Sequence, residues 1–189
     1  MKRFFIRLTA VAVVSLSWLC SSAQQKKPVP DAAPNPARVE MFKLLRSFEG
    51  SWNVFENFQK SEFFPKGGIR RGTARITPGP GRLSLVEDYH SNGSAGQLDL
   101  LAIIWWDNAA QIYRPMICAN DADGCVVRGT ARWQGNALIN DYEEVIGGRK
   151  RKMRDTFTDI TPTSFTLIAA VFTQGSEWQP LITTRYRRQ

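Results

Sequence analysis

Residues 48–59, FEGSWNVFENFQ, decide how the rest of the chain is interpreted. This stretch places Trp52 two residues after Gly50, at the point where a short helical pattern gives way to the alternation of apolar and polar residues that is typical of a strand. Runs of strand-forming residues separated by turn residues continue from there to the end of the chain. The stretch therefore predicts a short helix followed by antiparallel strands that cover Trp52.

The first 23 residues have the pattern of a secretory signal peptide. Residues 1–7 are basic with no acid, residues 8–20 are mostly apolar, and residues 21–23 are small. The apolar run is shorter than the roughly 20 residues that cross a bilayer, so we expect no transmembrane segment. Leu19 in place of a small residue before Cys20 argues against a lipid anchor. We predict an exported protein, periplasmic or extracellular.

Residues 24–37, QQKKPVPDAAPNPA, are predicted to form a disordered tether. The stretch holds four prolines and almost no large apolar group, so it cannot bury enough surface to become ordered. Asn35 and Pro36 make a good helix start, as cap and first helical residue, and Gly50 ends the helical spacing of apolar residues. The remaining residues, 38–189, are enough for one domain.

Without the leader the chain keeps 22 of its 25 basic residues and all 17 acids, a net charge of +5. Basic residues cluster at 149–152, beside a glycine pair that marks a turn. An exported protein seldom meets nucleic acid, and no nucleic-acid-binding motif accompanies the cluster. We therefore expect no nucleic-acid partner.

The chain after residue 50 reads as ten strands with short connections. Short connections pair consecutive strands as hairpins, and closing such a meander into an up-and-down barrel leaves no exposed edge. The predicted fold is therefore an all-β antiparallel barrel with a short N-terminal capping helix. The expected strands are 50–60, 69–78, 82–91, 97–107, 110–119, 124–133, 136–146, 150–159, 163–174 and 177–188.

Alternation places several carboxylates on the same strand faces as apolar residues. Glu87 and Tyr89 share one face of the third strand, Tyr142 and Glu144 share one face of the seventh, and Asp155 follows in the eighth. If these faces are internal, the barrel holds water or a polar-ended ligand, because buried carboxylates must otherwise be paired. A shift of one residue in the register of a strand would exchange its faces.

Trp105 and Trp106 follow each other at the end of the fourth strand, so they point to opposite sides. One of them faces the interior, and the other faces the helix, a partner or another surface. An indole ring offers about 150–250 Å² of surface, so the outer ring needs a cover.

Cys118 and Cys125 lie in CANDADGC. If the chain reverses at residues 121–122, the two cysteines stand directly opposite each other and can form a disulfide, which export would favour. A tight turn at Asp123 and Gly124 would instead put Cys125 opposite Ala122 and prevent the bond. We favour the disulfide as a staple of this hairpin.

The Gly50-Ser51-Trp52 motif after a short helix, together with an arginine-rich last strand, resembles the calycin superfamily of lipocalins and fatty-acid-binding proteins. In that superfamily the tryptophan packs against an Arg or Lys of the final strand and closes one end of the barrel. The resemblance assigns this structural role to Trp52 with Arg185 or Arg187.

A closer resemblance is to a bacterial lipocalin-like family whose function is not established. It is carried by LLRSFEGSW, WWDNAAQIYRPMIC, RGTARWQGNALIN and TTRYRR, in that order along the chain. The same superfamily includes the haem-binding nitrobindins, which hold iron through a histidine near the end of the chain. The single histidine, His90, does not match that position, so we expect no haem and no other cofactor.

Most catalytic chemistry lacks its residues here. A single histidine and two pairable cysteines leave no basis for a serine-hydrolase triad or a His/Cys metal site. Our leading hypothesis is noncatalytic binding of a small, partly apolar molecule inside the barrel. The alternatives are an enzyme that uses interior carboxylates as acid and base, and an envelope interaction protein with a filled barrel. The predicted ligand contacts are Glu87, Tyr89, Trp106 (or Trp105), Tyr142, Glu144 and Asp155.

Overall fold

The computed structural model describes residues 35–120, 124–146, 148–173, 175 and 177–189. The predicted signal peptide, residues 24–34 of the predicted tether and the turn at 121–123 lie outside the described residues. Among the helices that the model describes, none combines the length and the apolar character needed to cross a membrane.

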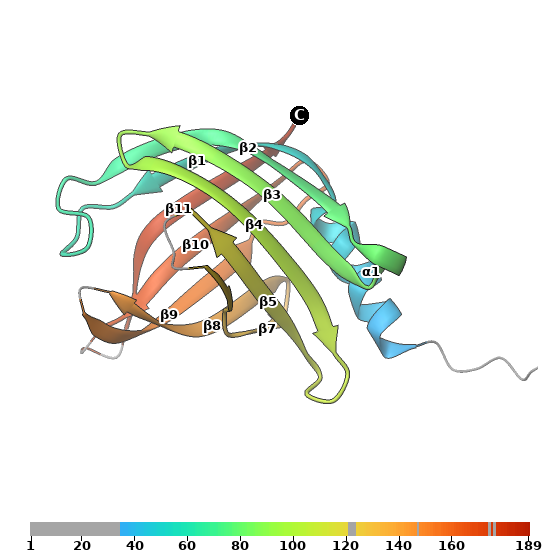
Figure 1. Ribbon diagram of the computed structural model, residues 1–189. Coiled ribbons are helices and arrows are strands. Elements are labelled where there is room, and N and C mark those ends of the chain that lie inside the picture. Colours follow the sequence, from blue (N-terminus) through green and yellow to red (C-terminus); the bar gives the residue numbers. More distant parts are fainter. Residues whose placement is uncertain (1–34, 121–123, 147, 174, 176) are drawn as a thin grey trace, which may run out of the picture. The chain divides into compact units, whose positions relative to one another are not determined.

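Helix α1 (Pro36–Phe48) begins where the sequence predicts it. The Asn35 side chain accepts a hydrogen bond from the Ala37 backbone N–H at 3.0 Å, and proline occupies the first turn, where its missing N–H costs nothing. The helix therefore includes the last two residues of the predicted tether. One face is buried against one end of the barrel (Figure 1), through Met41, Leu44, Leu45 and Phe48.

The strands follow the predicted ones closely. A single 3₁₀ turn, η1 (Pro80–Arg82), connects the second strand to the third. The predicted strand at 124–133 is divided in two, as β6 and β7. The strands are β1 (Gly50–Phe58), β2 (Gly68–Pro78), β3 (Ser84–Gly93), β4 (Gly96–Asp107), β5 (Ile112–Ala119), β6 (Cys125–Val127), β7 (Thr130–Gln134), β8 (Ala137–Ile146), β9 (Arg149–Thr158), β10 (Ser164–Phe172) and β11 (Trp178–Arg188).

The sheet closes on itself. Consecutive strands pair antiparallel, β1 also pairs with β11, and β5 pairs with β4 on one side and with β6 and β7 on the other. Because β6 and β7 occupy one place in the wall, the result is a ten-stranded up-and-down barrel (Figure 1). The predicted fold is confirmed.

The break between β6 and β7 is a bulge at Arg128 and Gly129. The Arg128 backbone N–H donates to the Pro115 carbonyl at 2.8 Å. The register with β5 differs by one residue between β6 and β7. Gly129 has a φ of +79°, and a Cβ there would lie 2.2 Å from the Asp141 carbonyl oxygen. Only glycine fits this position, and the bulge lets both Arg128 and Ala131 point into the barrel although they are three residues apart.

A disulfide staples the β5–β6 hairpin. Cys118 and Cys125 stand directly opposite each other in the register, with their Cα atoms 4.1 Å apart, and their sulfurs are bonded. This is the pairing that a reversal at 121–122 predicts.

Trp52 closes the helix end of the barrel. Its side chain is fully buried, its indole N–H donates to the Phe48 carbonyl at 2.9 Å, and its ring meets the edge of Phe165 at 4.9 Å. The helix end thereby holds an aromatic core in which the last turn of α1 and the first residues of β1 are bonded together.

The cation on the Trp52 ring is Arg188, which corrects the expectation of Arg185 or Arg187. The Arg188 guanidinium carbon lies 4.6 Å from the ring centre, and Arg188 pairs directly with Trp52 in the register. Arg185 and Arg187 have the opposite parity in β11 and are exposed. Gly50, with a φ of +151°, makes room, because a Cβ there would lie 2.4 Å from the Arg188 Nη1.

Candidate functional site

The interior changes character from the helix end of the barrel to the opposite end. The helix end is filled with apolar and aromatic side chains, among them Trp52, Leu85, Tyr113, Leu138 and Phe165. Toward the opposite end the wall contributes charged and polar side chains that point inward, and the first of them, Glu87 and Tyr89, border the aromatic core, to which Tyr89 also belongs. The charged and polar side chains are Glu56, Arg70, Glu87, Tyr89, Ser91, Arg128, Tyr142, Glu144 and Asp155. We consider this polar half the candidate site.

Glu87 and Tyr89 lie on the inward face of β3, with Leu85 and Ser91. Glu87 accepts a hydrogen bond from the Tyr186 hydroxyl at 3.3 Å. Burial raises the pKa of the Glu87 carboxyl to about 7, and the hydrogen bond from Tyr186 opposes that shift only in part. Glu87 can therefore carry a proton near neutral pH.

The other face of β3 points outward. His90 Nδ1 lies 2.8 Å from Asp99 Oδ1, and His90 Nε2 lies 3.0 Å from Asp88 Oδ1. The hydrogen bond with Asp99 raises the pKa of His90. These residues line a shallow hollow of about 350 Å³ beside the disulfide, outside the barrel wall.

A second polar group surrounds Arg128. Its Nη2 donates to the Tyr142 hydroxyl at 3.2 Å and to the Glu144 carboxylate, and its guanidinium lies 4.3 Å from the Tyr142 ring centre. The Tyr142 hydroxyl donates to Asp155 Oδ1 at 3.2 Å. Burial raises the pKa of Asp155 to about 6, with Arg128 as the main opposing influence. The structure thus brings three of the predicted residues together, around an arginine that the prediction did not include.

Glu56 and Arg70 form a buried ion pair in the same half. Arg70 donates twice to Glu56, from Nε at 2.7 Å and from Nη2 at 2.8 Å, and Ser91 donates to the same carboxylate at 2.8 Å. Glu56 and Arg70 are only 4% and 8% exposed. Removal of either side chain would therefore leave the charge of the other buried and unpaired. The sequence analysis did not identify Arg70 as an interior residue, although the alternation of β2 with buried Ala74 and Ile76 points Arg70 inward.

The polar half is not fully packed. Glu87 and Asp155 keep partial solvent accessibility although they face the interior, and so do apolar neighbours on the same inward faces: Leu100, Ile104, Leu167 and Ala169. At the helix end, by contrast, Trp52 and Tyr113 are 0% exposed. Water can therefore reach part of the surface of the interior carboxyls.

Some buried polar atoms in the barrel have no hydrogen-bond partner among the described residues. They are Tyr89 Oη, Trp106 Nε1, Asn140 Oδ1 and Arg151 Nε. Buried polar atoms nearly always form hydrogen bonds. Each of these four atoms can therefore form a hydrogen bond that no described residue supplies.

The loop between β1 and β2 packs on the rim of the polar half. Phe64 meets Phe58 edge to face at 4.9 Å, and Phe63 lies under the Arg151 guanidinium at 5.6 Å. Glu62 of the loop also pairs with Arg151 at 3.5 Å. This loop stands at the end of the barrel away from α1 (Figure 1).

Trp106 lies apart from the other predicted contacts. It points inward from the helix end of β4, and its ring meets the edge of Tyr113 at 4.9 Å within the aromatic core. Trp105 pairs with Arg114 and Ser84 on the outer face of the wall.

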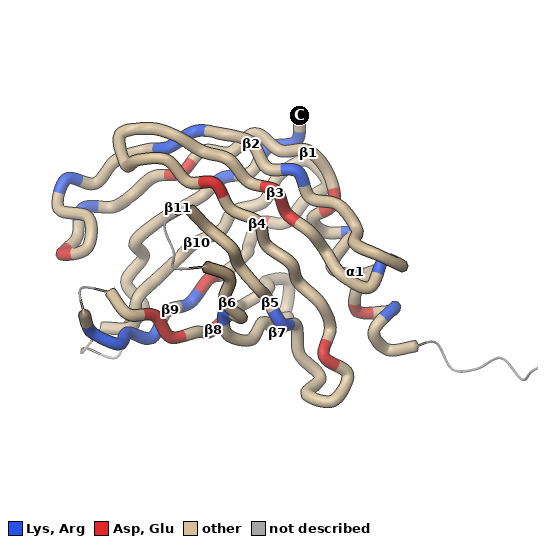
Figure 2. Tube along the Cα trace, viewed as in Figure 1, with Lys and Arg blue, Asp and Glu red and all other residues tan. Residues whose placement is uncertain are grey.

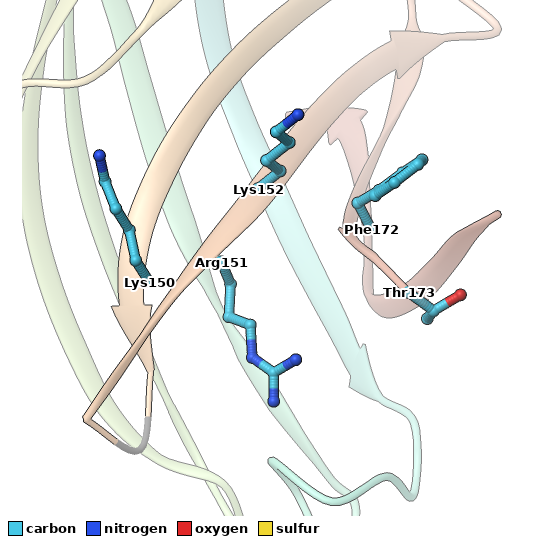
Figure 3. A pocket seen from close by; sticks show the side chains of 5 residues that line it. All are labelled: Lys150, Arg151, Lys152, Phe172 and Thr173. Atoms are coloured by element: carbon cyan, nitrogen blue, oxygen red, sulfur yellow. The ribbon is translucent and has the colours of Figure 1, made fainter. Parts of the chain in front are cut away.

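A basic hollow lies on the outside of the barrel, beside the β8–β9 turn, where Figure 2 shows the densest basic segment. It measures about 270 Å³, and Lys150 and Lys152 point away from Arg151 (Figure 3), as strand alternation requires. Lys150 pairs with Glu143, and Lys152 lies over the Phe172 ring at 5.9 Å. The hollow is shallow and much of its charge is neutralised.

In the described part of the chain, no group of three or more His, Cys, Asp or Glu residues is placed to hold a metal ion.

Comparisons with known proteins bear on the fold. No family model and no curated protein matches the chain. Among solved structures it is similar to the S-type phycobiliprotein lyase CPES from Guillardia theta, with a TM-score of 0.50 and 9% identity over 82% of this chain and 98% of that one. It is also similar to mFAP0, a redesigned β-barrel bound to DFHBI, with a TM-score of 0.41 and 13% identity over 74% and 97% of the two chains. The likeness to the lyase bears on the fold alone, and the protein has the fold of an antiparallel up-and-down β-barrel with one N-terminal helix.

Proposed function

We propose that this protein is an exported, noncatalytic β-barrel that binds a small, partly apolar molecule in the polar half of its interior. The main observation is that inward-facing carboxyl and aliphatic side chains there, such as Glu87, Asp155 and Leu167, keep accessible surface, while Trp52 and Tyr113 at the helix end are 0% exposed. In a barrel whose interior is simply filled, such carboxyls would not be expected, because burying a carboxyl without a partner costs free energy.

The shape of the interior supports the partly apolar character of the ligand. Leu100, Ile104 and Leu167 offer apolar surface between the polar groups and the aromatic core. Binding sites for small molecules combine such apolar walls with a few polar groups that orient the ligand. Export is supported by the disulfide, since disulfides persist mainly in oxidising compartments.

Native mass spectrometry of the protein recovered from the exported fraction of its own cells tests this proposal. The spectrum of the folded protein is compared with that of the denatured chain. We expect a discrete adduct that is lost on denaturation, and a denatured mass about 2 Da below that of the reduced chain because of the disulfide.

A bare folded mass, together with no binding of any apolar probe to the purified barrel, would contradict the proposal and favour the filled-barrel alternative. Recovery of the protein only from the cytoplasm would contradict the export part.

A second candidate function is an enzyme that uses interior carboxyls. The specific observation in its favour is that Glu144 is ion-paired to Arg128, while burial raises the pKa of the nearby Asp155 to about 6, so Asp155 can carry a proton in mildly acidic solution. An adduct that changes mass on incubation with the folded protein, and does not change with an Asp155→Asn variant, would favour this candidate over simple binding.

A further inference from the structure

The inward-facing arginines of the described chain are already matched by carboxylates. Arg70 is bound twice by Glu56, Arg128 is bound by Glu144, and Arg151 at the rim is paired with Glu62 of the β1–β2 loop. An anionic ligand would therefore have to displace one of these carboxylates and leave it unpaired in the barrel, which is costly.

Two inward-facing carboxyls remain after these pairs are formed. Asp155 accepts from the Tyr142 hydroxyl and shares the neighbourhood of Arg128 with Glu144. Glu87 has no basic partner: its hydrogen bond among the described residues comes from the Tyr186 hydroxyl. The interior thus has an excess of carboxyl groups over cations, and Glu87 is the clearest case.

Aromatic rings stand beside Glu87. Tyr186 reaches its carboxyl, and the Tyr89 and Tyr186 ring centres are 6.4 Å apart. The Tyr89 side chain is 4% exposed and its hydroxyl has no partner among the described residues. A carboxylate next to aromatic faces is the combination that attracts cations, through charge and through the ring quadrupole.

Resting on the function proposed above, we propose that the ligand carries an amino or other basic nitrogen group, which binds at the Glu87 carboxyl beside Tyr89 and Tyr186, with its apolar part along β4 and β10. The ammonium donates to the Glu87 carboxylate, and its remaining N–H groups can reach the hydroxyl of Tyr89. Asp155 stands on the opposite wall, because β3 and β9 are half the strand order apart around the barrel.

The test compares three ligands of equal chain length, decylamine, 1-decanol and decanoate, by titration calorimetry at neutral pH below their aggregation concentrations. We expect decylamine to bind about tenfold or more tightly than the other two, which corresponds to about 1.4 kcal/mol. In a Glu87→Gln variant, which keeps the shape of the side chain, the affinity for decylamine should fall to that for decanol.

Asp88→Asn is the matched control. It removes a carboxylate from the neighbouring residue of the same strand, but on the outer face, so the preference for the amine should persist. Urea unfolding of both variants verifies that they fold. If Glu87→Gln does not fold, Tyr89→Phe, which removes only the hydroxyl, should weaken decylamine binding without changing decanol binding.

The outcomes separate this inference from the function on which it rests. Binding of decanol or decanoate without a preference for the amine, or a preference that survives Glu87→Gln, would overturn the inference and leave the binding function standing. Failure of all three ligands to bind would overturn the inference and, together with a bare folded mass, the binding function as well.

Discussion

At the scale of single residues, Glu87 couples folding to pH. Its pKa of about 7 in the folded protein lies above the ordinary value of 4.5 because the carboxyl is buried. Between these two values the folded state holds more protons than the unfolded state. Stability is therefore fully present at low pH and falls as the pH rises through about 7.

We expect Glu87→Gln to reduce this pH dependence. The wild-type protein should lose up to about 3 kcal/mol of unfolding free energy between pH 4.5 and pH 8 through this group, whereas the variant keeps that part because glutamine does not ionise. Urea unfolding at both pH values measures the difference. Asp155 contributes a smaller fall in the same direction, so some slope should remain. An identical pH dependence in the two proteins would contradict the burial of an ionisable Glu87.

Arg188 and Arg187 form a matched pair for testing the closure of the helix end. Arg188→Ala removes the cation from the Trp52 ring and the hydrogen bonds to the Pro162 and Glu49 carbonyls, so we expect a loss of about 1–2 kcal/mol. Arg187→Ala removes an exposed side chain and should change stability by less than about 0.5 kcal/mol. Equal melting temperatures for the two variants would show that the stacked cation does not stabilise closure.

At the scale of the element, the bulge at 128–129 decides what the polar half contains. A straight strand over 125–134 would alternate regularly and could not point both Arg128 and Ala131 into the barrel. The bulge depends on Gly129, whose missing side chain lets the wall approach the Asp141 backbone closely.

We expect Gly129→Ala to destabilise the barrel by at least about 2 kcal/mol, because a Cβ meets backbone atoms and φ is positive. Gly135→Ala is the control: Gly135 also has a positive φ, +59°, but nothing lies within 4 Å of its Cβ position. Its cost should therefore be about 1 kcal/mol, from backbone conformation alone. Chemical denaturation measures both. A smaller loss for Gly129→Ala than for Gly135→Ala would contradict the close approach.

At the scale of the whole molecule, the described residues from Asn35 onward form one compact unit of helix and barrel. The helix belongs to that unit because its buried face supplies part of the aromatic core at one end.

We expect a chain that starts at residue 33 to unfold in a single transition. Starting the chain at residue 50 removes Met41, Leu44, Leu45 and Phe48 from the core and should leave the barrel unfolded at room temperature, since each buried residue contributes about 2–5 kcal/mol. Circular dichroism during heating distinguishes these outcomes, and a stable barrel without α1 would show that the helix only covers it.

The sequence by itself determined the helix with its Asn35 cap, the strand pattern and the closed barrel, because these depend on local turn chemistry and on alternation with a period of two. The same alternation identified Glu87, Tyr89, Tyr142, Glu144 and Asp155 as members of common strand faces. The disulfide also followed from local register, since its two cysteines are equidistant from one reversal.

Only the tertiary structure decided which residues meet across the barrel. The register of β1 with β11 places Arg188 on Trp52, and neither strand's own pattern distinguishes it from its arginine neighbours. The pairing of Arg70 with Glu56 and of Arg128 with Glu144 joins residues from different strands, and the second pairing also needs the bulge. Glu87 remains without a cationic partner because the neighbouring arginines are paired with other carboxylates. The absence of a cation beside Glu87 is therefore a property of the closed barrel, where low dielectric and proximity decide which carboxyl remains without a cation.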